Sequence, residues 1–246
     1  MENTKIKAVI LAAGKGTRLQ TEGSTLPKVM RLAAGKPLLG HVLTALDFIS
    51  PSDCVIVVGY QKEKVIEAFP NYIFAEQTQQ LGTGHAVMAA FTKLEGFGGS
   101  LLVCCGDMPL IKRETYLALI EAHGASDNVC TILSGSSELN LPYGRILRDE
   151  NGNFSGMVEE KDATDEQKQI RELNSGVYVF DARLLRGVLS ELKSDNAQGE
   201  YYLTDAPLLL QKHGHKIGVC FRELGCEIIG VNTLEQLKQT EELLQK

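Results

Sequence analysis

The stretch Ala8–Arg18, with the sequence AVILAAGKGTR, indicates the fold of the chain. Its first part, Ala8–Ala13, is short, apolar and continuous, as expected of a strand that is covered on both faces of a parallel sheet. Gly14 and Gly16 follow directly, and a glycine loop after such a strand can surround phosphate oxygens with backbone N–H groups. The stretch therefore predicts an α/β fold with an anion-binding loop behind its first strand.

The glycine loop matches neither of the two common phosphate-binding motifs. A Walker A motif has four residues between its first glycine and Gly-Lys-Ser/Thr, and the dinucleotide fingerprint has a third glycine where this chain has Leu19. Basic residues add specificity, because Lys15 and Arg18 lie in the loop and Lys28 follows Pro27 shortly after it. Three cations beside one loop favour a triphosphate ligand over a solvated turn.

Apolar strands and helices alternate through the first half of the chain. We expect further strands at Cys54–Val58, Tyr72–Ala75 and Ser100–Cys105, and helices at Pro37–Ile49, Glu63–Phe69 and Thr83–Leu94. Such alternation predicts a parallel sheet with right-handed crossovers. Ligands of these sheets bind at the carboxyl ends of the strands.

The second half is less regular. We expect strands at Arg145–Arg148, Phe154–Glu160, Val177–Phe180 and Ile228–Val231, and helices at Ala182–Leu192, Leu203–His213 and Thr233–Leu244. Asn151-Gly152 predicts a turn between the first two strands, and Thr233 with Gln236 forms a capping-box pattern. We find no linker or repeat, so we expect one domain over 1–232, with a nucleotide half (about 1–110) and a second-substrate half (about 111–232), followed by a terminal helix over 233–246.

Composition excludes several classes of protein. The 246 residues are 43% hydrophobic and 23% charged, as in an ordinary globular protein. A net charge of -6 argues against nucleic acid as a partner. Six cysteines without a C-x-x-C pair favour reduced core thiols over a zinc site. The N-terminus has no signal-peptide pattern, and no apolar run approaches the roughly 20 residues of a membrane span, so we expect a cytoplasmic protein without a membrane partner.

Several segments, taken with the glycine loop and Lys28, carry a family resemblance. They are Gln80–Ala86, Gly106–Leu110, Tyr143–Arg145, Val158–Asp165, Asn174–Gly176, Asn196–Asp205 and Gly230–Asn232. The chain resembles the sugar-1-phosphate nucleotidyltransferases, and among them the N-acetylglucosamine-1-phosphate uridylyltransferase (pyrophosphorylase) domain of the bacterial bifunctional enzymes. The matches run in one order from about residue 7 to residue 232, which is far more specific than a single motif.

The resemblance implies a three-layer, Rossmann-like, mixed but mainly parallel sheet with helices on both faces. It also implies a reaction: UTP and N-acetylglucosamine 1-phosphate give UDP-N-acetylglucosamine and pyrophosphate, with Mg²⁺ as cofactor. The sugar-phosphate oxygen would attack the α-phosphorus in line, with Lys28, Arg18 and Asp107 in catalytic roles. Asp107 and Asn232 would hold the metal through hard oxygen atoms. Because the nucleophile is already anionic, catalysis would rest on positioning and charge neutralisation.

The resemblance assigns binding residues to each substrate. Those for the nucleotide are Leu11, Ala12, Ala13, Gly14, Gly16, Thr17, Arg18, Lys28, Gln77, Gly82 and Thr83. Those for the sugar are Gly144, Glu159, Asn174, Tyr202 and Thr204. The amide of Gln77 suits the edge of uracil because it donates and accepts at once. Glu159 and Asn174 together supply the acceptors and donors that a hydroxyl-rich sugar needs.

The sequence departs from the family in four places. The loop over residues 21–25 is longer than usual, Cys105 stands where an aromatic residue is frequent, and Ser175 replaces a common threonine. The chain also ends at Lys246 without the hexapeptide repeats of the bifunctional enzymes, so we expect no acetyltransferase activity in it. Its oligomeric state stays open.

Two other functions remain open at this point. One is the same chemistry with another sugar 1-phosphate or nucleotide, such as glucose 1-phosphate with UTP or dTTP. The other is a non-catalytic sensor of nucleotide sugars, since a fold does not fix a function. The presence of Lys28, Asp107 and Asn232 together favours catalysis, because a sensor need not keep a metal site.

Overall fold

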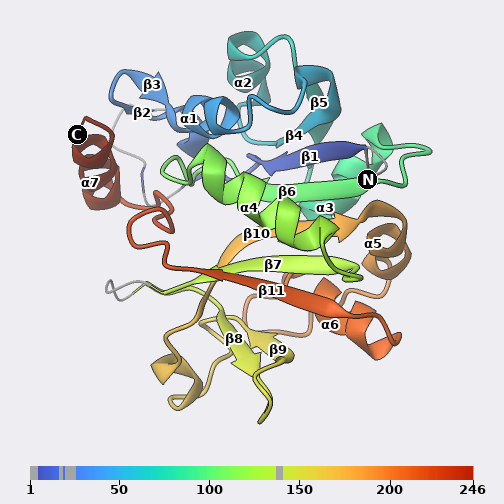
Figure 1. The fold of residues 1–246 in the computed structure, drawn as a ribbon. Helices are drawn as coiled ribbons and strands as arrows, with labels where there is room; N and C mark the ends of the chain where they lie inside the picture. The colour runs from blue at the N-terminus through green and yellow to red at the C-terminus, as the bar shows by residue number, and fades with distance from the viewer. Residues whose placement is uncertain (1–4, 17–18, 20–25, 137–140, 246) are drawn as a thin grey trace.

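A nine-stranded sheet forms the centre of the computed structural model, which describes residues 5–16, 19, 26–136 and 141–245 (Figure 1). Its strands follow the order β11-β7-β10-β6-β1-β4-β5, with β8 pairing β10 and β9 pairing β8. The strands are β1 (Ile6–Leu11), β4 (Cys54–Val58), β5 (Ile73–Glu76), β6 (Ser100–Cys105), β7 (Cys130–Gly135), β8 (Arg145–Arg148), β9 (Phe154–Val158), β10 (Leu173–Asp181) and β11 (Ile217–Arg222). A separate two-stranded sheet joins β2 (Leu32–Ala33) to β3 (Lys36–Pro37).

The directions of the strands make the central sheet mixed. Strands β5, β4, β1 and β6 run parallel to one another, as the alternation in the first half predicts. Strand β10 then lies antiparallel between β6 and β7, and β11 is parallel to β7. The hairpin β8–β9 extends the sheet beside β10. This arrangement confirms the predicted α/β fold class.

Helices cover both faces of the sheet. They are α1 (Leu38–Ala45), α2 (Lys62–Ala68), α3 (Thr83–Ala90), α4 (Arg113–Gly124), α5 (Ala182–Leu189), α6 (Asp205–Lys212) and α7 (Leu234–Leu244). Short 3₁₀ turns lie at Lys28–Met30, Pro51–Asp53, Phe91–Lys93 and Gln167–Gln169. One apolar cluster includes Leu39 of α1 and Leu119 of α4, and a second includes Val87 of α3 and Leu185 of α5. The three layers therefore bury apolar side chains on both sides of the sheet.

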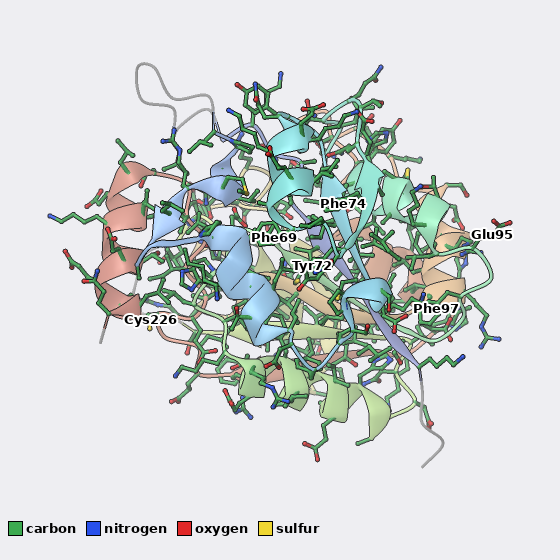
Figure 2. All side chains as sticks on the ribbon, turned by 90° about the horizontal axis from the view of Figure 1, so that it is seen from above. Phe69, Tyr72, Phe74, Glu95, Phe97 and Cys226 are labelled. Atoms are coloured by element: carbon green, nitrogen blue, oxygen red, sulfur yellow. The ribbon has the colours of Figure 1, made fainter. Side chains whose placement is uncertain are left out.

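Aromatic side chains close the first cluster near the edge strand β5. Phe69, Tyr72 and Phe74 are partly buried against it, and they lie near one another in Figure 2. The rings of Phe69 and Tyr72 meet edge to face, with 6.4 Å between their centroids. Aromatic rings prefer this arrangement because the positive edge of one faces the negative face of the other.

The observed elements differ from the expected ones at several points. The sequence did not predict three of the elements, which are strands β7 and β11 and helix α4. The helix expected over Pro37–Ile49 is shorter than predicted. The strand expected at Ile228–Val231 was wrong. This segment has no regular structure and is fixed by single contacts instead, because Val231 N donates to Asp107 O (2.9 Å) and Gly230 N donates to the Tyr143 hydroxyl (2.6 Å).

The terminal helix α7 packs on the same domain. Its capping box is present as predicted, with Thr233 and Gln236 each accepting a backbone hydrogen bond from the other. Leu237 and Leu244 pack against a small cluster that includes Leu38 and Val231. Figure 1 shows α7 beside β2 and β3. Among the described residues, no helix combines the length and the apolar character needed to cross a bilayer.

Candidate active site

The ends of β1 and β6 bring the glycine loop and Asp107 to one edge of the sheet. Gly106 N donates to Leu11 O (2.9 Å), which joins the two strands where both end. The Ala12–Gly16 loop leaves β1 there, and Asp107 lies just beyond β6. Val231 N bonds the carbonyl of Asp107, so the segment that carries Asn232 reaches the same edge. This is the position at which ligands bind in α/β sheets.

Gly16 makes room for Lys28. Its φ of +64° lies in the left-handed region that favours glycine. A Cβ added there would come within 2.5 Å of the Cβ of Lys28. The second glycine of the loop therefore allows the backbone to pass close to the lysine that begins the 3₁₀ turn Lys28–Met30.

Lys28 joins the two residues that the family resemblance assigns to the metal. Its ammonium Nζ donates to Asp107 Oδ2 and to Asn232 Oδ1, the latter at 3.0 Å. The side chains of Lys28 and Asp107 are each only 16% exposed. Both oxygen atoms contact the same ammonium group, so they lie close enough together to bind one metal ion. Mg²⁺ prefers hard oxygen ligands of this kind. The residues present therefore fit a magnesium ion.

A cavity of about 260 Å³ lies beside the glycine loop. The predicted nucleotide residues that line it are Leu11, Ala12, Ala13, Gly14, Lys28, Gln77, Gly82 and Thr83. Gly16 lies behind Lys28 rather than in this wall. Thr17 and Arg18 fall outside the described residues. The structure thus brings eight of the predicted residues to one cavity.

Gln77 is fixed in the wall of this cavity. It is buried directly after β5, and its Nε2 donates to Gly82 O (2.9 Å) and lies 3.1 Å from His85 Nδ1. Gly82 has a φ of +106°, and a Cβ there would come within 2.6 Å of Tyr201 O. Sequence reasoning gave His85 no role, although it lies inside a quoted motif. The contact between His85 and the Gln77 amide cannot be predicted from the spacing of the two residues in the sequence.

A second cavity of about 190 Å³ also has Asp107 in its wall. The predicted sugar residues that line it are Gly144, Glu159, Asn174 and Thr204. A side chain at Gly144 would crowd it, because a Cβ would lie 3.2 Å from Val158 O. Tyr202 is the exception among the predicted residues. Its hydroxyl bonds Asp162 (3.3 Å) and Gln198 (2.9 Å), and it lines a separate hollow behind Glu159 and Thr204.

The polar groups of the second cavity are held by other residues. Thr204 Oγ1 donates to Glu159 Oε1 (3.0 Å), and burial raises the pKa of the Glu159 carboxyl while this hydrogen bond opposes the rise. Asn174 Nδ2 donates to the Tyr178 hydroxyl (2.7 Å), and Asn174 Oδ1 accepts from Gly176 N (3.0 Å). Burial raises the pKa of Tyr178 well above its usual value, so this phenol stays neutral. These side chains are oriented before a ligand arrives.

The two cavities meet. Both are lined by Leu11, Thr83, Cys105 and Asp107, while Lys28 lines the first and Asn232 the second. Burial and the nearby Asp107 raise the pKa of the Cys105 thiol to about 12, which makes it a neutral wall residue rather than a nucleophile. A ligand in each cavity would therefore meet the other at Asp107.

A buried ion pair lies near the second cavity. Glu160 pairs with the buried Arg145 (2.6 Å), whereas its neighbour Lys161 donates through Nζ to Gln198 Oε1 (2.7 Å). Arg145 also donates to the backbone carbonyl of Tyr143, which lines the cavity. The pair forms because the guanidinium of Arg145 is buried and therefore requires a charged partner, which Glu160 supplies.

Residues 8–209 match a family model described as the MobA-like NTP transferase domain. The chain belongs to this family. Several similar relatives in sequence are named bifunctional protein GlmU. The one from Lactococcus lactis subsp. lactis (strain IL1403) is 43% identical over 240 residues, covering 97% of this chain and 52% of the relative. The one from Caldanaerobacter subterraneus subsp. tengcongensis is 44% identical over 245 residues, covering 98% and 52%. This MobA-like chain thus spans about half the length of the curated relatives it matches.

Two solved structures share the fold of this MobA-like domain. A putative glucose-1-phosphate thymidylyltransferase from Bacillus anthracis has a TM-score of 0.75 at 19% identity, covering 98% of this chain and 96% of the other. The inositol-1-phosphate CTP transferase from T. maritima has a TM-score of 0.70 at 19% identity, covering 98% and 95%. At such identities the likeness supports the fold alone, and it agrees with the Rossmann-like sheet that the family resemblance implied.

Proposed function

We propose that the chain transfers a uridylyl group from UTP to N-acetylglucosamine 1-phosphate, giving UDP-N-acetylglucosamine and pyrophosphate. The observation that carries the proposal is the meeting of two cavities at Asp107, with Lys28 on one side and Asn232 on the other. The similarity to the bifunctional proteins GlmU over 97% of the chain supports the choice of substrates.

The reaction is a displacement at phosphorus. An oxygen of the sugar phosphate forms a bond to the α-phosphorus of UTP. The bond from that phosphorus to the oxygen that bridges it to the β-phosphorus breaks, and pyrophosphate leaves with this oxygen. The chain supplies position and charge, since neither a covalent intermediate nor a strong base is required. The nucleoside would lie along Leu11–Gly14 with its base at Gln77, and the sugar would lie at Glu159 and Asn174.

Lys28 would neutralise the phosphate oxygens as negative charge moves toward pyrophosphate. Its ammonium group lies at the junction of the cavities and is largely shielded from solvent, which strengthens such an interaction. Asp107 and Asn232 would hold Mg²⁺, which when bound supplies further positive charge to phosphate oxygens.

The polar groups of the second cavity would recognise the sugar. Glu159 Oε2 lies 3.6 Å from the position of a Cβ at Gly144, so the carboxylate borders the space that the missing side chain leaves. Asn174 is fixed by Tyr178 and Gly176 and would present its amide without a conformational search.

The deciding experiment measures pyrophosphate release with Mg²⁺ for a panel of substrates. UTP, dTTP, ATP, CTP and GTP are each combined with the 1-phosphates of N-acetylglucosamine, glucose, galactose and mannose. We expect turnover with UTP and N-acetylglucosamine 1-phosphate. A hundredfold preference for glucose 1-phosphate, about 2.7 kcal/mol in the transition state, would overturn the sugar assignment. Tight binding of UDP-sugars by folded protein without any turnover would replace the enzyme with a sensor.

A further inference from the structure

The backbone of Asn232 is held by one side chain of the helix that follows it. Asn232 lies between the turn that ends at Ile228 and the start of α7, in a segment without regular structure. Gln236 Oε1 accepts from Asn232 N (2.8 Å) and from Thr233 N (3.1 Å). One amide oxygen of α7 thus binds two consecutive backbone N–H groups, the first of them on Asn232 itself.

This contact differs from an ordinary helix cap. In a capping box the side chain at the fourth position bonds the N–H of the cap residue, and here Gln236 does so at Thr233. The bond to Asn232 N is additional, and helix capping does not require it. It fixes the peptide plane from which the Asn232 side chain projects toward Lys28.

The two oxygens that meet Lys28 are supported in different ways. Asp107 follows the central strand β6, and its carbonyl is bonded by Val231 N. Asn232 has no strand behind it, and within the described part of the chain its side-chain Nδ2 donates only to Gly230 O, at 3.3 Å. Lys28 contacts the amide oxygen itself, and the bond to Gln236 restrains the backbone from which the Asn232 side chain extends.

Gln236 is itself held because α7 is docked on the domain. Gln236 N donates to Thr233 Oγ1 (3.2 Å), and Leu237 beside it packs in the cluster with Leu38 and Val231. Further along α7, Glu241 Oε1 accepts from Ala34 N (3.2 Å). A restraint on Gln236 is therefore transmitted to Asn232 from the whole helix.

We propose that Gln236 is a positioning residue for the metal site, acting by its double bond to the backbone at Asn232 and Thr233. The proposal rests on the metal role of Asn232 in the proposed function. It makes α7 a part of the active site, because undocking the helix would release one of the two metal ligands. Groups that orient a metal ligand commonly change metal affinity about 10- to 100-fold when removed.

The test compares two variants that both disrupt the capping box, only one of which loses the hydrogen bond to Asn232 N, with two control variants. Gln236→Ala removes both bonds to the backbone, whereas Thr233→Ala breaks the reciprocal bond of the capping box and leaves the acceptor for Asn232 N in place. Gln236→Glu keeps an acceptor oxygen, and Gln239→Ala changes the same residue type elsewhere on α7. Mn²⁺ binding to each full chain is measured by electron paramagnetic resonance without substrates, and thermal unfolding is measured alongside.

We expect Gln236→Ala to weaken Mn²⁺ binding about tenfold. Thr233→Ala should lower the melting temperature yet keep wild-type affinity, and Gln236→Glu and Gln239→Ala should keep it as well. Equal affinities in Gln236→Ala and Thr233→Ala would overturn the proposal. A wild-type chain that binds no Mn²⁺ while remaining folded would instead refute the metal role in the proposed function.

A second measurement needs no variant to fold. In the wild-type chain the backbone N–H of Asn232 should exchange its hydrogen slowly, because its acceptor Gln236 belongs to a helix that is docked on the domain. Exchange of this amide at the rate of an exposed loop would contradict the positioning role.

Discussion

Lys28 is the residue at which binding and chemistry meet, since its ammonium contacts both Asp107 and Asn232. Lys28→Met keeps an unbranched side chain of nearly the same length and removes its charge. We expect kcat to fall about a hundredfold, more than KM rises, because the lost interaction strengthens as charge develops. We also expect the substrate-free protein to bind Mn²⁺ more tightly, because no ammonium competes for the two oxygens.

Steady-state kinetics and Mn²⁺ titration check both expectations. Lys62→Met is the matched control, since Lys62 forms a comparable but exposed pair with Glu76 (2.6 Å). An unchanged kcat in Lys28→Met would mean that Lys28 only holds ground-state phosphate. Weaker Mn²⁺ binding would mean that the lysine supports the metal site rather than competing for it.

Glu159 should reduce stability at neutral pH in exchange for recognising the sugar. Burial raises the pKa of its carboxyl, so the folded state favours the protonated form. That favourable contribution is complete below the pKa of the unfolded chain and is lost as pH rises through the higher folded pKa. Glu159→Gln should therefore unfold at a higher temperature than wild type near pH 7, with a difference that shrinks as pH falls.

Thermal unfolding followed across pH, together with the KM for the sugar phosphate, tests this exchange. We expect that KM to rise while the KM for UTP stays close to wild type, since Glu159 lines the second cavity and not the first. A variant less stable than wild type at neutral pH would show that the ionised carboxylate is well satisfied in the fold.

At the scale of the elements, the glycine loop requires glycine at Gly16 for a reason that its sequence alone does not show. Gly16→Ala would place a Cβ against Lys28 and in the left-handed region, at a cost of about 1–3 kcal/mol in the free energy of unfolding. We also expect lower kcat/KM, because Lys28 must move. Gly14→Ala is the comparison, since a Cβ there meets nothing within 4 Å, and it should leave stability unchanged. Chemical denaturation that finds equal losses in both variants would contradict this account.

Elements were predictable where their pattern is local. Strands β4 and β6 have the predicted bounds because they are nearly continuous apolar runs. Strand β7 interrupts its apolar run with Thr131 and Ser134, which are buried because His123 (2.9 Å) and Glu172 (2.5 Å) bond them. Those partners lie outside the strand, so the sequence of β7 alone does not reveal how its hydroxyl groups are satisfied.

The same distinction applies to the site within the whole molecule. The family resemblance gives Lys28, Asp107 and Asn232 roles at the phosphates and the metal, and in the structure the Lys28 ammonium contacts the other two. Tyr202 carried a sugar role by resemblance, yet its hydroxyl bonds Asp162 outside the cavity. Gln236 was visible in the sequence only as a cap. Its second bond, to Asn232, depends on how the chain enters α7, which no pattern of residues specifies.

Hydrogen bonds across the molecule join the two cavities. Thr83 lines both of them, and its Oγ1 accepts from Leu203 N (3.0 Å), while Gly84 N donates to Tyr201 O (2.7 Å). The start of α3, beside the nucleotide cavity, thereby fixes the segment that leads to Thr204 in the sugar cavity. A change at Thr83 should therefore be felt by both substrates.

Thr83→Val removes the acceptor of the Leu203 N–H with little change in volume. We expect the KM for the sugar phosphate to rise together with the KM for UTP, because a buried N–H left without a partner shifts Leu203 and its neighbour Thr204. Thr92→Val, at an exposed hydroxyl that bonds Ala89 O (2.8 Å), controls for the substitution itself. If initial-rate kinetics show a change in the KM for UTP alone, the two cavities are not coupled through this bond, and each substrate is held by its own half of the sheet.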